Sequence, residues 1–205
     1  LDGQAVDIAV VSDRANDTLA IFRIDAAART LTDITSPELS AAGFSIFGVD
    51  DGEATAYGLA TYKSFDDGQS YAFATQADGN LVAQLRLFDA GGGTVGAEVV
   101  RTIELPVPEG DDPEDSQSEG IVVDRETGQL YVATEDNIGI LRYSAAPDGG
   151  NDYTLIAPVG APVLAPDIEG LSLYYGANGS GYLIASSQGD STFAVYERQG
   201  NNAFV

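Results

Sequence analysis

Four carboxylates of this chain stand at the ends or starts of short apolar runs, where they could act together. They are Glu119, Glu135, Asp167 and Glu169, within Ser116-Gln-Ser-Glu-Gly120, Leu130-Tyr-Val-Ala-Thr-Glu-Asp136 and Pro166-Asp-Ile-Glu-Gly170. The chain has no His and no Cys. Oxygen ligands without imidazole or thiolate suit hard cations, so a site shared by these side chains would hold Ca²⁺ or Mg²⁺ and not Zn²⁺. A solvated turn residue is the alternative interpretation of each.

The charge balance limits the partners of the protein. Among 205 residues, 32 are acidic and nine are basic, which gives a formal net charge of −23. Nucleic acid and anionic membranes both require a basic face, so we expect neither as a partner. The balance fits exposure to high salt or binding of divalent cations, although a solvated acidic surface accounts for most of the charges. The absence of His and Cys also excludes phosphohistidine and phosphocysteine intermediates.

Composition and length indicate a globular domain with one core. Apolar residues make up 44% of the chain and charged residues 20%, which is ordinary for a folded domain. No apolar run approaches the roughly 20 residues that span a bilayer, and Leu1-Asp-Gly-Gln4 does not begin a signal peptide. The chain starts without Met, and Asn202-Ala-Phe-Val205 resembles the start of a strand. We therefore expect a piece of a longer protein.

The elements that would position the carboxylates are predicted to be β-strands, because alternating and short apolar runs dominate and no segment is a convincing amphipathic helix. Four strand pairs recur. They are Val6–Arg14 with Thr18–Asp25, Ser70–Thr75 with Leu81–Asp89, Leu130–Thr134 with Ile138–Tyr143, and Gly181–Ser186 with Ser191–Glu197. In the last three copies a further strand precedes the pair. These strands are Tyr57–Tyr62, Glu119–Asp124 and Glu169–Tyr174, each followed by a turn at Gly68, Gly128 or Gly179.

The copies lie roughly 50–60 residues apart, measured between Ala74, Ala133 and Ala185. A repeat of about 40–60 residues with three or four strands is typical of a β-propeller blade. We predict an all-β fold, a single partial propeller domain over residues 1–205, with blades near 1–40, 41–105, 116–160 and 166–205. A sandwich of irregular hairpins is the alternative. Four blades leave the outer faces of the first and last blades uncovered.

Several segments, in order along the chain, resemble the β-propeller phytases. They are Gln117–Asp136, Ser144–Gly150, Ala165–Tyr175 and Ala185–Gly189 through Tyr196–Gly200. The resemblance implies a six-bladed, Ca²⁺-dependent enzyme, of which about four blades are represented here. It further implies that such an enzyme removes phosphate from phytate, inositol hexakisphosphate, as a 3-phytase-like phosphomonoesterase. We also expect a monomeric bacterial protein that is secreted or periplasmic.

The resemblance also implies roles for individual residues. Glu119, Glu135, Asp167 and Glu169 correspond to carboxylates around the active-site Ca²⁺ ions, and Gln188 lies near a Ca²⁺-binding position. Glu119, Tyr57 and Arg14 correspond to the catalytic set, with Tyr57 as the site tyrosine and Arg14 as a phosphate-contacting arginine. The alternatives are a core or interface aromatic for Tyr57, and for Arg14 a surface ion pair with Asp13 or Asp17.

The chain departs from the family pattern at several places. Two acidic segments and a cationic pair of the family would precede Leu1, and a closing blade with further aspartates would follow Val205. The lysine expected shortly after Thr75 is represented by Ala77. These departures leave a second hypothesis open, an incomplete propeller that binds Ca²⁺ or phytate without turnover. A third is an extracellular propeller scaffold with no chemistry.

The leading hypothesis follows from charge. Phytate and this protein are both strongly anionic, so carboxylates near a phosphate repel it unless a cation lies between them. Calcium held by the four carboxylates would reverse the local sign and activate a water for direct attack on phosphorus. Arg14 could then bind a phosphate with two hydrogen bonds, and Tyr57 could donate one.

Overall fold

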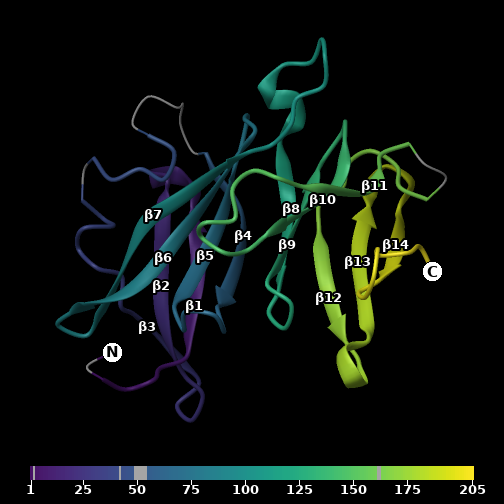
Figure 1. Ribbon diagram of the computed structural model, residues 1–205. Coiled ribbons are helices and arrows are strands. Elements are labelled where there is room, and N and C mark those ends of the chain that lie inside the picture. Colours follow the sequence, from purple (N-terminus) through teal and green to yellow (C-terminus); the bar gives the residue numbers. More distant parts are fainter. Residues whose placement is uncertain (2, 42, 49–54, 161–162) are drawn as a thin grey trace.

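The strands form four separate antiparallel sheets (Figure 1). The computed structural model describes residues 1, 3–41, 43–48, 55–160 and 163–205. Sheet 1 contains β1 (Ile8–Asp13), β2 (Thr18–Asp25) and β3 (Thr30–Asp33). Sheet 2 contains β4 (Ala56–Lys63), β5 (Ser70–Gln76), β6 (Leu81–Gly91) and β7 (Thr94–Glu104). Sheet 3 contains β8 (Ser118–Asp124), β9 (Gln129–Thr134), β10 (Gly139–Ser144) and β11 (Thr154–Pro158), and sheet 4 contains β12 (Leu171–Tyr175), β13 (Gly181–Ser187) and β14 (Thr192–Glu197).

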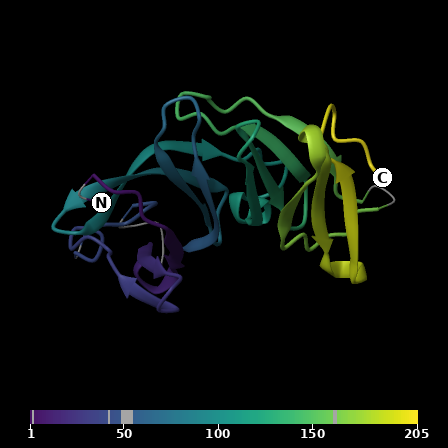
Figure 2. The ribbon, with the colours of Figure 1, turned by 90° about the horizontal axis from the view of Figure 1, so that it is seen from below.

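Each sheet is built from strands that follow one another in the sequence and pair with their immediate neighbours. Seen from below, the four sheets follow one another along an arc (Figure 2). The helical segments of the described residues are short 3₁₀ turns, η1 (Arg14–Asn16), η2 (Pro113–Ser116), η3 (Ala177–Gly179) and η4 (Gln188–Asp190). No described helix has the length and apolar character needed to span a bilayer. The prediction of an all-β fold is thus confirmed, whereas the number of blades and the closure of a ring stay predictions.

The predicted strands are present with small shifts at their ends. One of the two-residue shifts concerns a candidate site residue, Glu169, which we expected to begin a strand and which lies two residues before β12. Three strands were not predicted: β3, β7 and β11. Every residue of β3 is exposed, and β11 has one buried residue, so neither carries a clear apolar pattern. The third, β7, follows the run Gly91-Gly-Gly93, which indicates a loop at that point.

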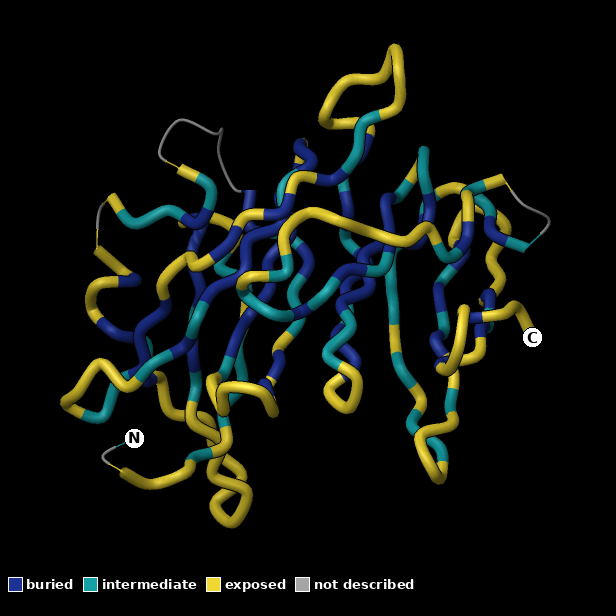
Figure 3. The backbone as a smooth tube through the Cα atoms, in the orientation of Figure 1, coloured by how far each residue is buried: buried dark blue, intermediate teal, exposed yellow. Residues whose placement is uncertain are grey.

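The core lies between neighbouring sheets, and three apolar clusters fill the three junctions. The middle strands contribute to two clusters at once because successive side chains point to opposite faces. On β9, Leu130 and Val132 pack in the cluster between sheets 2 and 3. Tyr131 and Ala133 of the same strand pack in the cluster between sheets 3 and 4. Buried residues therefore line the middle strands (Figure 3).

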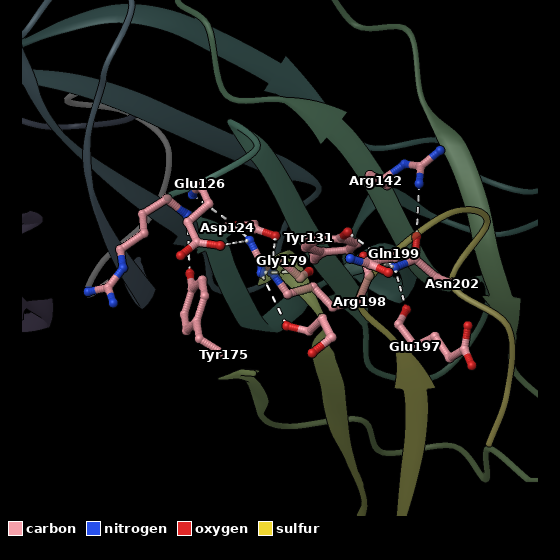
Figure 4. Close-up of polar contacts among 12 residues, drawn as sticks. Asp124, Glu126, Tyr131, Arg142, Tyr175, Gly179, Glu197, Arg198, Gln199 and Asn202 are labelled. Atoms are coloured by element: carbon pink, nitrogen blue, oxygen red, sulfur yellow. Dashed lines mark hydrogen bonds and ion pairs between the residues drawn. The ribbon is translucent and has the colours of Figure 1, made fainter. Parts of the chain in front are cut away.

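A buried ion pair joins sheets 3 and 4 (Figure 4). Arg198, directly after β14, donates from Nε and Nη2 to the carboxylate of Asp124 over 2.6 and 2.7 Å. Its Nη2 also lies 2.7 Å from Glu126, and its Nη1 donates to the carbonyl of Gly179 over 3.0 Å. The guanidinium covers the ring of Tyr175 at 4.5 Å. Burial alone would raise the pKa of Asp124, but the bonds from Arg198 lower it below its ordinary value.

Candidate functional site

The first strands of the four sheets line one depression of about 380 Å³. Each sheet contributes three consecutive residues to its lining. They are residues 10–12 of β1, 57–59 of β4, 119–121 of β8 and 169–171, which lead into β12. The depression therefore gathers Tyr57 from β4, Glu119 from β8 and Glu169 from the segment that leads into β12. The sequence placed these residues at equivalent positions of the repeat, and the structure brings them to one place.

A glycine follows each of these three side chains, and at Gly58 the fold requires it. A Cβ added to Gly58 would lie 2.1 Å from the carbonyl oxygen of Glu119 and 2.9 Å from Oγ1 of Thr75. At Gly120, an added Cβ would lie 3.2 Å from the Cβ of Ala133, a tighter fit than usual. At these two positions the residue after the functional side chain is thus small because neighbouring strands approach closely, whereas a Cβ added to Gly170 would make only an ordinary contact of 3.9 Å with Ser186.

Tyr57 and Glu119 form a hydrogen bond across the junction between sheets 2 and 3. The hydroxyl of Tyr57 donates to Oε2 of Glu119 over 2.8 Å. This hydrogen bond, burial and the negative charges of Glu119, Glu135 and Glu169 together raise the pKa of Tyr57 well above its ordinary value. The phenol therefore stays protonated and acts as a donor.

Arg14 lies beside this pair. Arg14 is the first residue of η1, directly after β1. Its guanidinium carbon is 4.8 Å from the centre of the Tyr57 ring. A cation above an aromatic face is attracted by the ring. Tyr57 of sheet 2 therefore contacts the Arg14 cation with its ring and the Glu119 carboxylate of sheet 3 with its hydroxyl. Arg14 follows β1, so sheets 1, 2 and 3 meet at this side chain.

Glu135 directly follows β9 and is held by an amide. Gln117 donates from Nε2 to both carboxylate oxygens of Glu135, over 3.1 and 3.0 Å. Burial raises the pKa of Glu135, the bonds from Gln117 oppose this, and the charges of Glu119, Asp136 and Glu169 raise it further. The backbone carbonyl of Glu135 accepts from the N–H of Asp167 over 2.7 Å. This bond ties the end of β9 to the segment that carries Asp167 and Glu169.

Asp167 and Glu169 share one donor. Nε2 of Gln188 donates to Oδ2 of Asp167 over 2.7 Å and to Oε1 of Glu169 over 2.8 Å. Asp167 has a left-handed backbone with φ 72°, and its carbonyl accepts from the backbone N–H of Gln188 over 2.9 Å. Gln188 thus turns its nitrogen toward the carboxylates. A metal ligand would have to present its amide oxygen instead, so the predicted metal role of Gln188 stays a prediction.

The donor set fits a hard cation, although no shared coordination shell is formed. The hydrogen-bond partners of the four carboxylates described above are a phenol and two amides, which are neutral and leave the negative charge of the cluster in place. All candidate ligands are oxygens, as Ca²⁺ and Mg²⁺ prefer. Within the described ranges, however, no three acidic side chains converge closely enough to hold one ion. The carboxylates share a region and would need to move together to bind.

Gln117 was not predicted as a site residue. It precedes the Ser118-Glu119-Gly120 motif, and its polar side chain close to the predicted ligand Glu119 is the feature that could have identified it. Ala77, which stands where the resemblance places a lysine, is buried, and its N–H donates to the carbonyl of Thr55 over 2.7 Å. It supplies no cation to the site.

A family model and a curated relative both point to one family. A model of the phytase family matches residues 1–205. A 3-phytase of Bacillus subtilis strain 168 is 36% identical over 207 residues, which cover 100% of this chain and 49% of the relative. The chain thus spans about half the length of the curated relative it matches.

One solved structure bears on the fold alone. A Bacteroides fragilis protein, provisionally assigned as a 6-phosphogluconolactonase, superposes with a TM-score of 0.53 at 14% identity. The match covers 96% of this chain and 49% of that chain.

Proposed function

The chain belongs to the phytase family, and on that premise we propose that it provides the calcium-binding and phosphate-binding face of an enzyme that hydrolyses phytate. The observation that carries the proposal is the gathering of Tyr57, Glu119 and Glu169 around one depression, with Arg14 beside them. The sheets would be about four blades of a six-bladed propeller. Their consecutive antiparallel strands and their arrangement along an arc support this assignment.

Calcium is the proposed cofactor. Glu119, Glu135, Asp167 and Glu169 would hold it, and Gln188 would join them if its amide turned over. When bound, the cation supplies the positive charge that an anionic phosphate needs here and acidifies the attacking water. Without it, the uncompensated carboxylates repel the substrate. The 3-phytase relative supports phytate as the substrate.

The other side chains bind and orient the phosphate. Arg14 carries a permanent positive charge, and its planar guanidinium can donate two parallel hydrogen bonds to a phosphate. Its contact with the Tyr57 ring holds it at the edge of the depression. Tyr57 stays protonated and can donate to a phosphate oxygen when a cation engages Glu119 in its place. Phosphoryl transfer needs little more from a protein than such positioning and charge stabilisation.

An incomplete, non-catalytic domain is the second candidate. It is favoured by Ala77, which leaves the site without the cation that the family pattern places there. Such a domain would bind calcium and phytate and depend on further chain for turnover. A scaffold without chemistry is the remaining candidate. We further propose a monomer that is exported from a bacterial cell.

Release of phosphate from phytate separates the three candidates. We expect the intact protein that contains this chain to release phosphate with calcium and to stop when a chelator is added. The measurement is inorganic phosphate over time, with phytate binding followed in parallel by calorimetry. Calcium-dependent binding without release would establish the incomplete domain. If phytate is neither bound nor hydrolysed, the proposed function is refuted and the scaffold is the candidate that remains.

A further inference from the structure

Gln117 connects two sheets at the edge of the site. It lies between η2 and β8, and all of its side-chain polar atoms have partners in other segments. Its Oε1 accepts from the backbone N–H of Asp78 over 2.6 Å, in the turn between β5 and β6 of sheet 2. Its Nε2 donates to both carboxylate oxygens of Glu135, which follows β9 in sheet 3. Its backbone carbonyl accepts from the N–H of Glu135 over 3.0 Å.

The direction of this amide is determined by its partners. A backbone N–H can only donate, and an ionised carboxylate can only accept. Reversing the amide would place its oxygen against the carboxylate of Glu135 and its nitrogen against the N–H of Asp78. Gln117 therefore has one satisfied orientation, and in that orientation its NH2 group faces both carboxylate oxygens of Glu135.

Glu135 needs such a donor because its neighbours are acidic. Glu119, Asp136 and Glu169 all lie near enough for their charges to act on it. Like charges in a partly buried region repel one another, so an unrestrained Glu135 side chain would turn away from the cluster. The bonds from Gln117 oppose that movement without adding a positive charge that would compete with a bound cation.

We propose that Gln117 is a positioning residue that holds the Glu135 carboxylate in the calcium-binding cluster and anchors it to the β5–β6 turn of the neighbouring sheet. The inference rests on the proposed function of the same cluster. Partners that orient a metal ligand typically account for about 10–100-fold in metal affinity. Gln117 would act on calcium affinity through Glu135 and would not itself contact the ion.

A double-mutant cycle tests this inference with calcium alone. We expect Gln117→Met, which keeps the length of the side chain and removes both polar ends, to weaken calcium binding by about 10–100-fold. In a Glu135→Gln background the same substitution should change the affinity by less than about twofold, since coupled residues are not additive. Calcium titrations of the four chains by calorimetry give the affinities. Gln69→Met, an exposed glutamine in the β4–β5 turn, is the matched control and should bind like the wild type.

The outcomes distinguish this inference from the proposed function. Equal calcium affinity in Gln117→Met and wild type, or an equal loss in both backgrounds, would overturn the positioning role and leave the calcium site standing. A wild-type chain that binds no calcium would overturn both. If Gln117→Met fails to fold, Gln117→Asn, which keeps the amide but is one methylene shorter, must show the same loss and the same dependence on Glu135.

Discussion

Calcium at 100 times its dissociation constant is expected to raise the melting temperature of the wild-type chain, and Glu119→Gln or Glu169→Gln is expected to remove most of that rise. A ligand that binds only the folded state stabilises it by about 2.7 kcal/mol at this excess. For a chain of this length that corresponds to roughly 5–10 °C. Replacing a carboxylate by an amide removes a negative charge and a strong oxygen ligand together.

Thermal unfolding with and without calcium measures this effect. The matched control is Glu104→Gln, the same change in charge at an exposed position at the end of β7, which should keep the full rise. A variant at Glu119 or Glu169 that responds to calcium like the wild type would remove that residue from the site. Phosphate release by the same variants should fall in parallel. When calcium is not bound, the carboxylates that remain in the cluster repel the anionic substrate.

Arg198→Met is expected to destabilise the fold by about 3–5 kcal/mol, the usual result of leaving a buried charge without its partner. The side chains of Arg198 and Asp124 are 1% and 0% exposed, and their two hydrogen bonds are 2.6 and 2.7 Å long. The substitution would leave the Asp124 carboxylate buried at the junction of sheets 3 and 4. The melting temperature should fall by roughly 6–20 °C.

Arg86→Met is the control for this effect. Arg86 also forms an ion pair, with Glu98, and also lies over an aromatic ring, that of Phe88. Its pair is solvent-exposed, at 37% and 50%, and exposed pairs contribute about 0–1 kcal/mol. Equal losses of stability in chemical denaturation of the two variants would contradict the assignment of Arg198 as the polar link between sheets.

The strand pattern could be predicted from the sequence because the core is built on alternation. Along β5 and β9, both sets of alternate side chains are apolar and face two neighbouring sheets, so the runs stand out even over six or seven residues. The outer strands lack this signal. β3 is exposed at every position, and its pairing with β2 depends on backbone hydrogen bonds that leave no mark on the side chains.

The candidate site could be predicted only in part. Glu119 and Glu169 stood out as carboxylates beside predicted strands, and the resemblance to the β-propeller phytases added Tyr57; the structure brings all three to one depression. The hydrogen bonds that hold these side chains depend on how the sheets pack against one another, and the sequence pattern does not show which side chains the packing brings into contact. Gln117 meets Asp78 across 39 positions and Glu135 across 18, and Gln188 reaches back to Asp167 and Glu169.

The central claim is that calcium lets an acidic protein bind an even more acidic phosphate ester. Calorimetric titration of phytate into the 205-residue chain, with calcium or with a chelator, tests it most directly. We expect saturable binding with calcium and none with the chelator, since the carboxylates around Tyr57 are uncompensated when calcium is removed. Equal phytate binding under both conditions would contradict it, because the protein would then recognise phosphate without a cation between the two anions.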